Sequence, residues 1–191
     1  MKRAKTAIIA VQALALFFGA SACSASASNP KVEIEMEDGG KIDLQLDRKN
    51  APITVDNFIS LVSSGFYNGL TFHRIAPGFV IQGGDPNGDG TGGSSKAIKG
   101  EFAANGVQNK ISHKRGVISM ARSQDPNSAS CQFFITLSDD YTSVLDGQYA
   151  AFGKVISGMD EVDKIAAMPN SGPPNNTALQ PPVIKSIKVV S

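Results

Sequence analysis

Alternating apolar and polar residues mark the start of the folded part of the chain. Over residues 32–46, apolar side chains occupy every second position on both sides of the turn-forming Asp38-Gly39-Gly40. These positions are Val32, Ile34, Met36, Ile42, Leu44 and Leu46. A period of two residues with a glycine-rich turn between the halves predicts a β-hairpin with one buried face.

The apolar period changes to that of a helix in two places. Over residues 52–64, Val55, Phe58, Ile59 and Val62 recur at helical spacing, with Pro52 near the start of the segment. This spacing places all four side chains on one face of a helix. A second helix is predicted over residues 158–168, where Met159, Val162, Ile165 and Ala166 provide an apolar stripe.

Short β-like runs, separated by glycines and polar turns, fill most of the remaining chain. They cover residues 70–75, 79–82, 116–121, 132–137 and 150–156. A Pro- and Asn-rich loop is expected over 169–182, followed by a final strand from residue 183. Seven or eight short strands with two helices favour a mainly β fold, a closed antiparallel β-barrel capped by two α-helices.

The N-terminus has the order of an export signal. Lys2, Arg3 and Lys5 precede an apolar run over residues 7–18, and small residues follow to position 27. The apolar run is shorter than the about 20 residues that a membrane-spanning helix needs. We therefore interpret residues 1–28 as a signal peptide with a short linker, and residues 29–191 as one domain. The protein is expected in the periplasm or anchored to an envelope membrane of a bacterium.

Cys23 lies within the small-residue segment of this signal. The segment Ala20-Ser21-Ala22-Cys23 resembles a bacterial lipoprotein box, although that pattern usually has a Leu-like residue where Ala20 stands. Two alternatives stay open: acylation of Cys23 with membrane anchoring, or ordinary cleavage after Ala22 or Ala27. The other cysteine, Cys131, precedes an apolar run and is expected to be a buried, inert thiol. No disulfide framework is expected.

The charge balance gives no support for nucleic-acid binding. Without residues 1–22, fifteen basic side chains face seventeen acidic ones, a net charge of about −2. No basic stripe and no block of like charge is present in the sequence.

Three motifs suggest cofactor or metal chemistry but lack the required context. Residues 88–93, GDGTGG, fit a dinucleotide fingerprint, yet no helix start follows and no βαβ unit surrounds them. Asp85 and Asp89 begin like a calcium loop, but Lys96 stands where a bidentate Glu is needed. His73 and His113 are forty residues apart, without a cysteine cluster for zinc. No cofactor and no metal are therefore expected.

A long series of short motifs runs through the chain from residue 72 to residue 155. They are Phe72-His73-Arg74, Pro77-Gly78-Phe79, Ile81-Gln82-Gly83-Gly84-Asp85, Gly90-Thr91-Gly92-Gly93, Ser119-Met120-Ala121, Gln132-Phe133-Phe134-Ile135, Leu145-Asp146-Gly147 and Phe152-Gly153-Lys154-Val155. In these motifs and in their order, the chain resembles the cyclophilin family of peptidyl-prolyl cis-trans isomerases, and the resemblance covers residues 31 to about 190, nearly the whole mature chain. The resemblance implies an eight-stranded barrel and isomerisation of X–Pro peptide bonds in polypeptide substrates.

The resemblance also implies a role for each matched residue. Arg74 matches the catalytic arginine, with Gln82 and Phe79 beside it, whereas His73 matches a structural histidine. The residues matched to substrate binding are Phe134, Gln132, Ala121, Arg122, Leu145, Tyr149 and Val80. Arg122 stands where the family often has Asn, which predicts some preference for acidic residues flanking the proline.

Two other functions compete with an exported isomerase. A non-catalytic module or chaperone could hold Pro-containing segments in the same groove, but such a binder has little need of Arg74. A structural envelope protein would be expected to show repeats or an exposed apolar face, and the sequence has neither. We expect a monomer.

Overall fold

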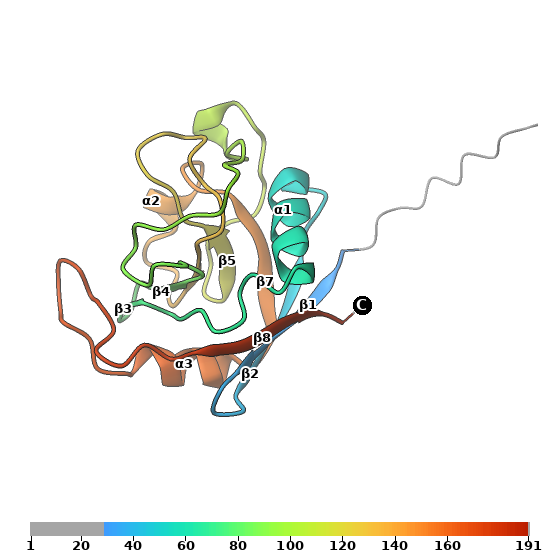
Figure 1. The fold of residues 1–191 in the computed structure, drawn as a ribbon. Helices are drawn as coiled ribbons and strands as arrows, with labels where there is room; N and C mark the ends of the chain where they lie inside the picture. Colours follow the sequence, from blue (N-terminus) through green and yellow to red (C-terminus); the bar gives the residue numbers. More distant parts are fainter. Residues whose placement is uncertain (1–28, 191) are drawn as a thin grey trace, which may run out of the picture.

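Eight β-strands form one antiparallel sheet in the computed structural model, which describes residues 29–190 (Figure 1). Along the sheet the strands follow the order β3-β4-β6-β5-β7-β2-β1-β8. The strands are β1 (Lys31–Met36), β2 (Lys41–Leu46), β3 (Arg74–Ala76), β4 (Val80–Gly83), β5 (Val117–Met120), β6 (Phe133–Thr136), β7 (Ala151–Ser157) and β8 (Ile184–Val189). The prediction of a mainly β, eight-stranded antiparallel fold is confirmed.

The predicted closure of the barrel is wrong, because the sheet is an open half-barrel. Strands β3 and β8 end the strand order and share no ladder. Residues 69–72 and 182–184 are joined by a bridge between Thr71 and Val183 and by a few backbone hydrogen bonds around it, and a second isolated bridge pairs Arg74 with Thr177. Strand β3 has three residues, and Pro181 and Pro182 lead into β8. Proline has no N–H to donate, so the ladder cannot continue through this pair.

The first hairpin forms as the alternation predicts. Strands β1 and β2 pair with Ile34 opposite Ile42, and every second residue of both strands is buried. At the turn, the N–H of Met36 donates to the carbonyl of Gly40 at 2.8 Å, and Gly39 has a φ of +90°. This positive φ explains the glycine, since other residues rarely adopt it.

Both predicted helices are present, and a short third one is added. Helix α1 (Pro52–Ser63) and helix α3 (Met159–Ala166) bury their apolar faces against the core. Helix α2 (Thr142–Leu145) and a 3₁₀ turn (Ala103–Asn105) were not predicted, since each is too short to show a period. The segment 169–182 is a loop with three bridged positions: Asn170 is paired with Ala178, and Thr177 is paired with Arg74 of β3.

Strands β3, β4 and β6 carry apolar residues on both of their faces. Ile75, Ile81 and Phe133 belong to the main core, where Phe133 contacts the rings of Phe58 and Phe72 edge-on. A second, smaller buried cluster lies on the other face and consists of Ala76, Val80, Phe134 and Leu145. Successive side chains of a strand point to opposite faces, so this second cluster is separated from the core by the sheet itself.

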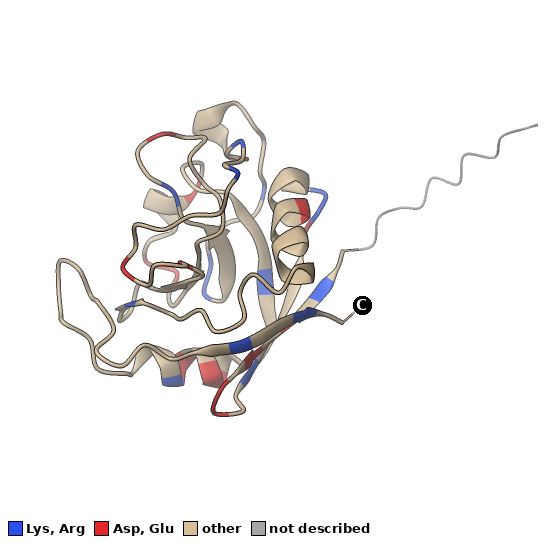
Figure 2. Ribbon diagram, in the orientation of Figure 1, with Lys and Arg blue, Asp and Glu red and all other residues tan. Residues whose placement is uncertain are grey.

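Acidic and basic residues are interspersed over the strands and helices (Figure 2). Opposite charges pair locally, as in Arg115 with Asp163 of α3 and Lys185 of β8 with Glu35 of β1. Among residues 29–190, no helix has the length and apolar character to cross a membrane. The expected signal peptide and Cys23 lie outside the described residues.

A buried carboxylate from a distant loop caps the start of α1. Residue Ala51 precedes the helix and offers no side-chain cap. Glu101, which is 2% exposed, accepts hydrogen bonds from the backbone N–H groups of Ile53 (3.1 Å) and Thr54 (2.8 Å) and from the Thr54 hydroxyl (2.7 Å). These donors would otherwise have no intrahelical partner. Glu101 thereby ties the loop before the 3₁₀ turn to α1.

Replacing Glu101 with Ala should lower the free energy of unfolding by about 2–3 kcal/mol, because buried donors lose a charged acceptor. Urea denaturation followed by circular dichroism measures this change. Glu37, an exposed carboxylate of the β1–β2 turn, provides the matched control. Glu37→Ala should stay within about 0.5 kcal/mol of wild type. Equal effects of the two substitutions would contradict the capping role.

Candidate active site

Three predicted site residues lie in one row across neighbouring strands. Arg74 of β3 is paired with Gln82 of β4, and Gln82 is paired with Phe134 of β6. Cross-strand partners project on the same face, so these side chains share the face opposite the main core. The sheet register therefore brings together residues that are up to sixty positions apart in the chain.

A chain of hydrogen bonds fixes the polar side of this row. The Arg74 guanidinium donates to Oε1 of Gln82 at 3.2 Å, and Nε2 of Gln82 donates to Oε1 of Gln132 at 2.9 Å. Gln132 in turn donates to the carbonyls of Gly90 (3.1 Å) and Gly92 (2.8 Å). Each amide thus has a fixed orientation, and the position of Arg74 is linked to the 88–93 loop.

An apolar pocket of about 190 Å³ opens beside the Arg74 guanidinium. Phe134 and Leu145 are almost fully buried in its wall, and Tyr149 contacts the Phe134 ring edge-on at 5.6 Å. Nine of the ten residues matched to catalysis and binding line this one pocket. They are Arg74, Phe79, Val80, Gln82, Ala121, Arg122, Phe134, Leu145 and Tyr149.

Arg74 is partly withdrawn from water, although it carries the charge of the site. Its Cζ lies 5.8 Å from the centre of the Phe79 ring. Burial lowers the pKa of the guanidinium, and the nearby Tyr149 opposes this shift. An arginine stays protonated under such a change, so the pocket holds a permanent cation in an environment of low dielectric.

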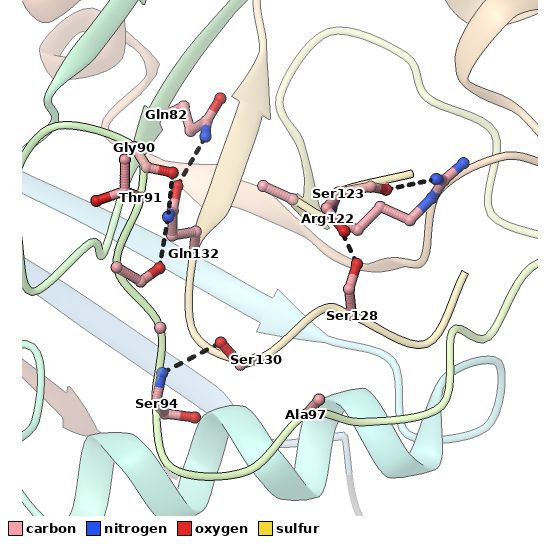
Figure 3. A pocket seen from close by; sticks show the side chains of 13 residues that line it. Gln82, Gly90, Thr91, Ser94, Ala97, Arg122, Ser123, Ser128, Ser130 and Gln132 are labelled. Carbon is pink, nitrogen blue, oxygen red and sulfur yellow. Dashed lines mark hydrogen bonds between the residues drawn. The ribbon is translucent and has the colours of Figure 1, made fainter. Parts of the chain in front are cut away.

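A polar groove of about 410 Å³ adjoins the pocket and contains the tenth residue, Gln132 (Figure 3). Gln82, Ala121 and Arg122 border both spaces, so the pocket and the groove are neighbours. One wall of the groove is the 90–94 segment. The motif GDGTGG therefore forms part of the groove wall, and no helix begins there.

The acidic residues that resemble a calcium loop hold this wall in shape. Asp85, which is 1% exposed, accepts backbone N–H bonds from Asn87 (3.0 Å), Asp89 (3.1 Å) and Gly90 (2.5 Å). Its oxygens are thus already engaged within the loop. Asp89 likewise accepts bonds from the N–H and hydroxyl of Thr91.

Arg122 is held by backbone carbonyls and by aromatic rings. Its guanidinium donates to the carbonyls of Gln148 (3.0 Å) and Ser123 (2.8 Å), and it lies 4.8 Å from the centre of the Tyr149 ring. Its charge remains at the border between pocket and groove. The preference for acidic residues flanking the proline stays a prediction.

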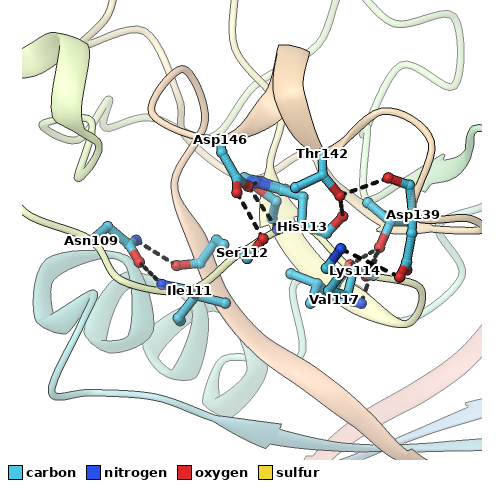
Figure 4. A network of polar contacts seen from close by, with 12 residues as sticks. Asn109, Ile111, Ser112, His113, Lys114, Val117, Asp139, Thr142 and Asp146 are labelled. Carbon is cyan, nitrogen blue, oxygen red and sulfur yellow. Dashed lines mark hydrogen bonds and ion pairs between the residues drawn. The ribbon is translucent and has the colours of Figure 1, made fainter.

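Sequence reasoning assigned no role to His113, which lies in a network of polar contacts with Asp146 (Figure 4) and also contacts Phe134 of the pocket wall. Its Nδ1 lies 2.8 Å from Asp146, its Nε2 lies 3.0 Å from the Ser119 hydroxyl, and its ring stacks on Phe134 at 6.1 Å. His113 and Ser119 are buried, so this Asp–His–Ser series has no access to substrate. The Asp146 side chain also accepts the backbone N–H of His113. In the sequence, His113 stands in no motif with Asp146, Ser119 or Phe134, so these contacts could not be predicted.

The chain belongs to the cyclophilin-type peptidyl-prolyl cis-trans isomerase family. The family model described as "Cyclophilin type peptidyl-prolyl cis-trans isomerase/CLD" matches residues 31–189. Peptidyl-prolyl cis-trans isomerase A of Dickeya dadantii is 41% identical over 197 residues, which cover 99% of this chain and 98% of that protein. A peptidyl-prolyl cis-trans isomerase of Acinetobacter baylyi is 41% identical over 93% of this chain and 95% of its own length.

Solved structures agree with this assignment. A cyclophilin-type isomerase of Cryptosporidium parvum, crystallised in the presence of the dipeptide Ala-Pro, superposes with a TM-score of 0.75. The two chains are 32% identical, and the match covers 84% of this chain and 99% of the other. The fold and the matched motifs therefore lead to the same family.

Both histidines should make the fold less stable in mild acid. Burial is the main cause that lowers the pKa of His73 and of His113; for His113 the hydrogen bond to Asp146 opposes the shift. As pH falls through about 6.5, the unfolded chain binds protons that the folded chain does not. The free energy of unfolding should therefore decrease from pH 7 to pH 5.

Urea denaturation at pH 5, 6, 7 and 8 measures this dependence. His113→Gln, which cannot gain the charge, should reduce the slope between pH 7 and pH 5 even where it lowers stability at every pH. Asp146 has a lowered pKa and adds a further loss only below about pH 4. A stability that is constant or higher at pH 5 would contradict the assignment of neutral, buried histidines.

Proposed function

We propose that this protein catalyses cis–trans isomerisation of X–Pro peptide bonds in polypeptides. The observation that carries the proposal is the fixed Arg74 guanidinium beside an apolar pocket. The family membership and the relatives named as isomerases support it.

The chemistry of this reaction requires no nucleophile, metal or cofactor. Amide resonance opposes rotation about the X–Pro bond with a barrier of about 18–20 kcal/mol. The uncatalysed rotation takes on the order of tens of seconds or more. No covalent bond breaks, so the enzyme has only to stabilise the twisted amide relative to both planar forms.

Arg74 supplies the group that favours the twisted amide. When resonance is lost, the proline nitrogen regains its lone pair and becomes a better hydrogen-bond acceptor. A guanidinium donor aimed at that nitrogen stabilises the transition state more than either ground state. Gln82 and Phe79 hold the donor in place, so little reorganisation is needed during the rotation.

The apolar pocket holds the proline ring while the bond rotates. Phe134, Leu145 and Val80 form its buried wall, with Phe79 and Tyr149 at the sides. The residues on one side of the proline extend into the groove, where the backbone of Ala121 and Arg122 and the Gln132 side chain offer polar contacts. The related structure with an Ala-Pro dipeptide supports a Pro-containing peptide as substrate. We propose that one copy of the chain contains the whole site and acts as a monomer.

Arg74→Ala should reduce kcat/KM by about 10²–10³-fold while the protein stays folded, because the transition state loses its charged donor. A protease-coupled isomerisation assay with a short X–Pro peptide measures this loss, and circular dichroism reports the fold. Arg74→Lys should recover only part of the activity, since an ammonium lacks the planar fork of the guanidinium.

Arg48→Ala is the matched control, because Arg48 is paired with Asp56 at α1 and lines no part of the pocket. It should retain wild-type activity. A wild-type protein that binds the peptide without accelerating isomerisation would overturn the proposal in favour of a non-catalytic binding module. An Arg74→Ala variant as active as wild type would overturn the assignment of the arginine.

We also propose that the protein is exported and acts in the bacterial periplasm or envelope. The basic, apolar and small-residue order of residues 1–28 supports export, so the substrates would be proteins of the bacterial periplasm or envelope. The segment Ala20-Ser21-Ala22-Cys23 supports acylation of Cys23, which would anchor the domain to a membrane. Residues 24–30 would then form the link between the lipid and β1.

Acylation can be measured on the protein made in bacterial cells. Mass spectrometry should find a mature chain that begins at Cys23 and carries lipid, and this chain should fractionate with membranes. Cys23→Ala should release the protein into the soluble fraction without a change in kcat/KM. A lipid-free mature chain that begins after Ala22 or Ala27 would contradict the anchor and leave export intact.

A further inference from the structure

An exposed aromatic side chain stands at the rim of the proline pocket. Tyr141 is 41% exposed, and its ring centre lies 4.5 Å from that of Phe79 at an angle of 50°. The Cζ of Arg74 lies 5.8 Å from the centre of the same Phe79 ring. Phe79 therefore connects Tyr141 directly to the centre of the proposed site. Nothing in the matched motifs assigned a role to Tyr141.

The backbone around Tyr141 is fastened to the turn that carries Phe79. The N–H of Leu137 donates to the carbonyl of Phe79 at 2.8 Å, and the Ser138 hydroxyl donates to the carbonyl of Gly78 at 2.9 Å. The carbonyl of Tyr141 then accepts the N–H of Leu145, whose side chain is part of the pocket wall. The ring is thus held in position before any peptide binds.

Val144 of helix α2 is also exposed to solvent. It lies three residues after Tyr141 and is 59% exposed, and its N–H donates to the Tyr141 carbonyl at 3.1 Å. Helix α2 therefore buries Leu145 in the pocket while it leaves Tyr141 and Val144 in contact with solvent. Large apolar side chains beside a binding pocket gain free energy when a partner covers them.

The size and position of the pocket indicate what would cover this rim. A pocket of about 190 Å³ accepts one small ring and leaves the neighbouring substrate residues outside. Residues on one side of the proline pass Ala121 and Arg122 into the polar groove. The groove does not include Phe79, Tyr141 or Leu145, so the rim is open to the residue on the other side of the proline.

We propose that Tyr141 forms a further substrate subsite for an apolar or aromatic side chain next to the proline. The subsite is continuous with the pocket through Phe79 and makes the protein selective for such sequences. This inference rests on the proposed isomerase function, because it names the substrate class of that same site.

The test compares peptides that differ only in the residues flanking one proline. Two series carry Phe, Leu, Ala or Gly, one series immediately before and the other immediately after the proline. Isomerisation is followed without a protease, by exchange NMR, so that protease specificity does not enter. Wild type should prefer Phe and Leu over Gly by about five- to tenfold in kcat/KM in one of the two series.

Tyr141→Ala should remove most of this preference while the rate on the Gly peptides changes less than about twofold. Tyr141→Phe should keep the preference, because the apolar ring face is retained. Ile156→Ala is the matched control, since Ile156 is similarly exposed at 44% on β7 and lines neither the pocket nor the groove. It should leave both series unchanged.

Two results would overturn the subsite. One is a wild-type protein that isomerises Phe, Leu, Ala and Gly peptides of both series at equal kcat/KM. The other is a Tyr141→Ala variant that loses activity equally on every peptide, which would show that Tyr141 only supports Phe79. Absence of activity on all peptides would instead contradict the isomerase function, so the two failures are distinguishable.

Discussion

The two-residue period of the strands is the constraint on which both the core and the candidate site depend. In β3, β4 and β6 the residues of each pair Arg74–Ile75, Ile81–Gln82 and Phe133–Phe134 point to opposite faces. The inward members pack into the main core, and the outward members form the site. A shift of one residue in pairing would exchange the two sets. Burial of the core therefore fixes the geometry of the site at the same time.

The polar half of the site is rigid because each of its groups has a partner. Arg74 donates to Gln82, Gln82 donates to Gln132, and Gln132 donates to two carbonyls of the 88–93 loop. Asp85 holds that loop from within. A reaction that only twists an amide gains most from such fixed dipoles, since no proton or electron pair has to be transferred to the protein.

Segments that are remote in the chain complete the apolar half. His113 and Asp146 support Phe134 from behind, and the residues before α2 bring Tyr141 against Phe79. These contacts join segments that are far apart in the chain to one pocket wall. The open edge of the half-barrel lies at β3, the strand that carries Arg74. The pairing of β3 with β4 still holds Arg74 beside Gln82, so the missing closure does not interrupt the site.

The sequence alone determined the first hairpin and the two longer helices, because apolar periods of two and 3.6 residues are local properties. Its long motifs also identified the family, and with it the residues around Arg74. Only the tertiary structure decided that the sheet stays open, because closure depends on whether β3 can pair with the Pro-preceded β8. Only the tertiary structure revealed three contacts: the hydrogen bonds from the start of α1 to Glu101, the stacking of His113 on Phe134, and the packing of Tyr141 against Phe79. Such contacts join residues far apart in the chain, and no local pattern encodes them.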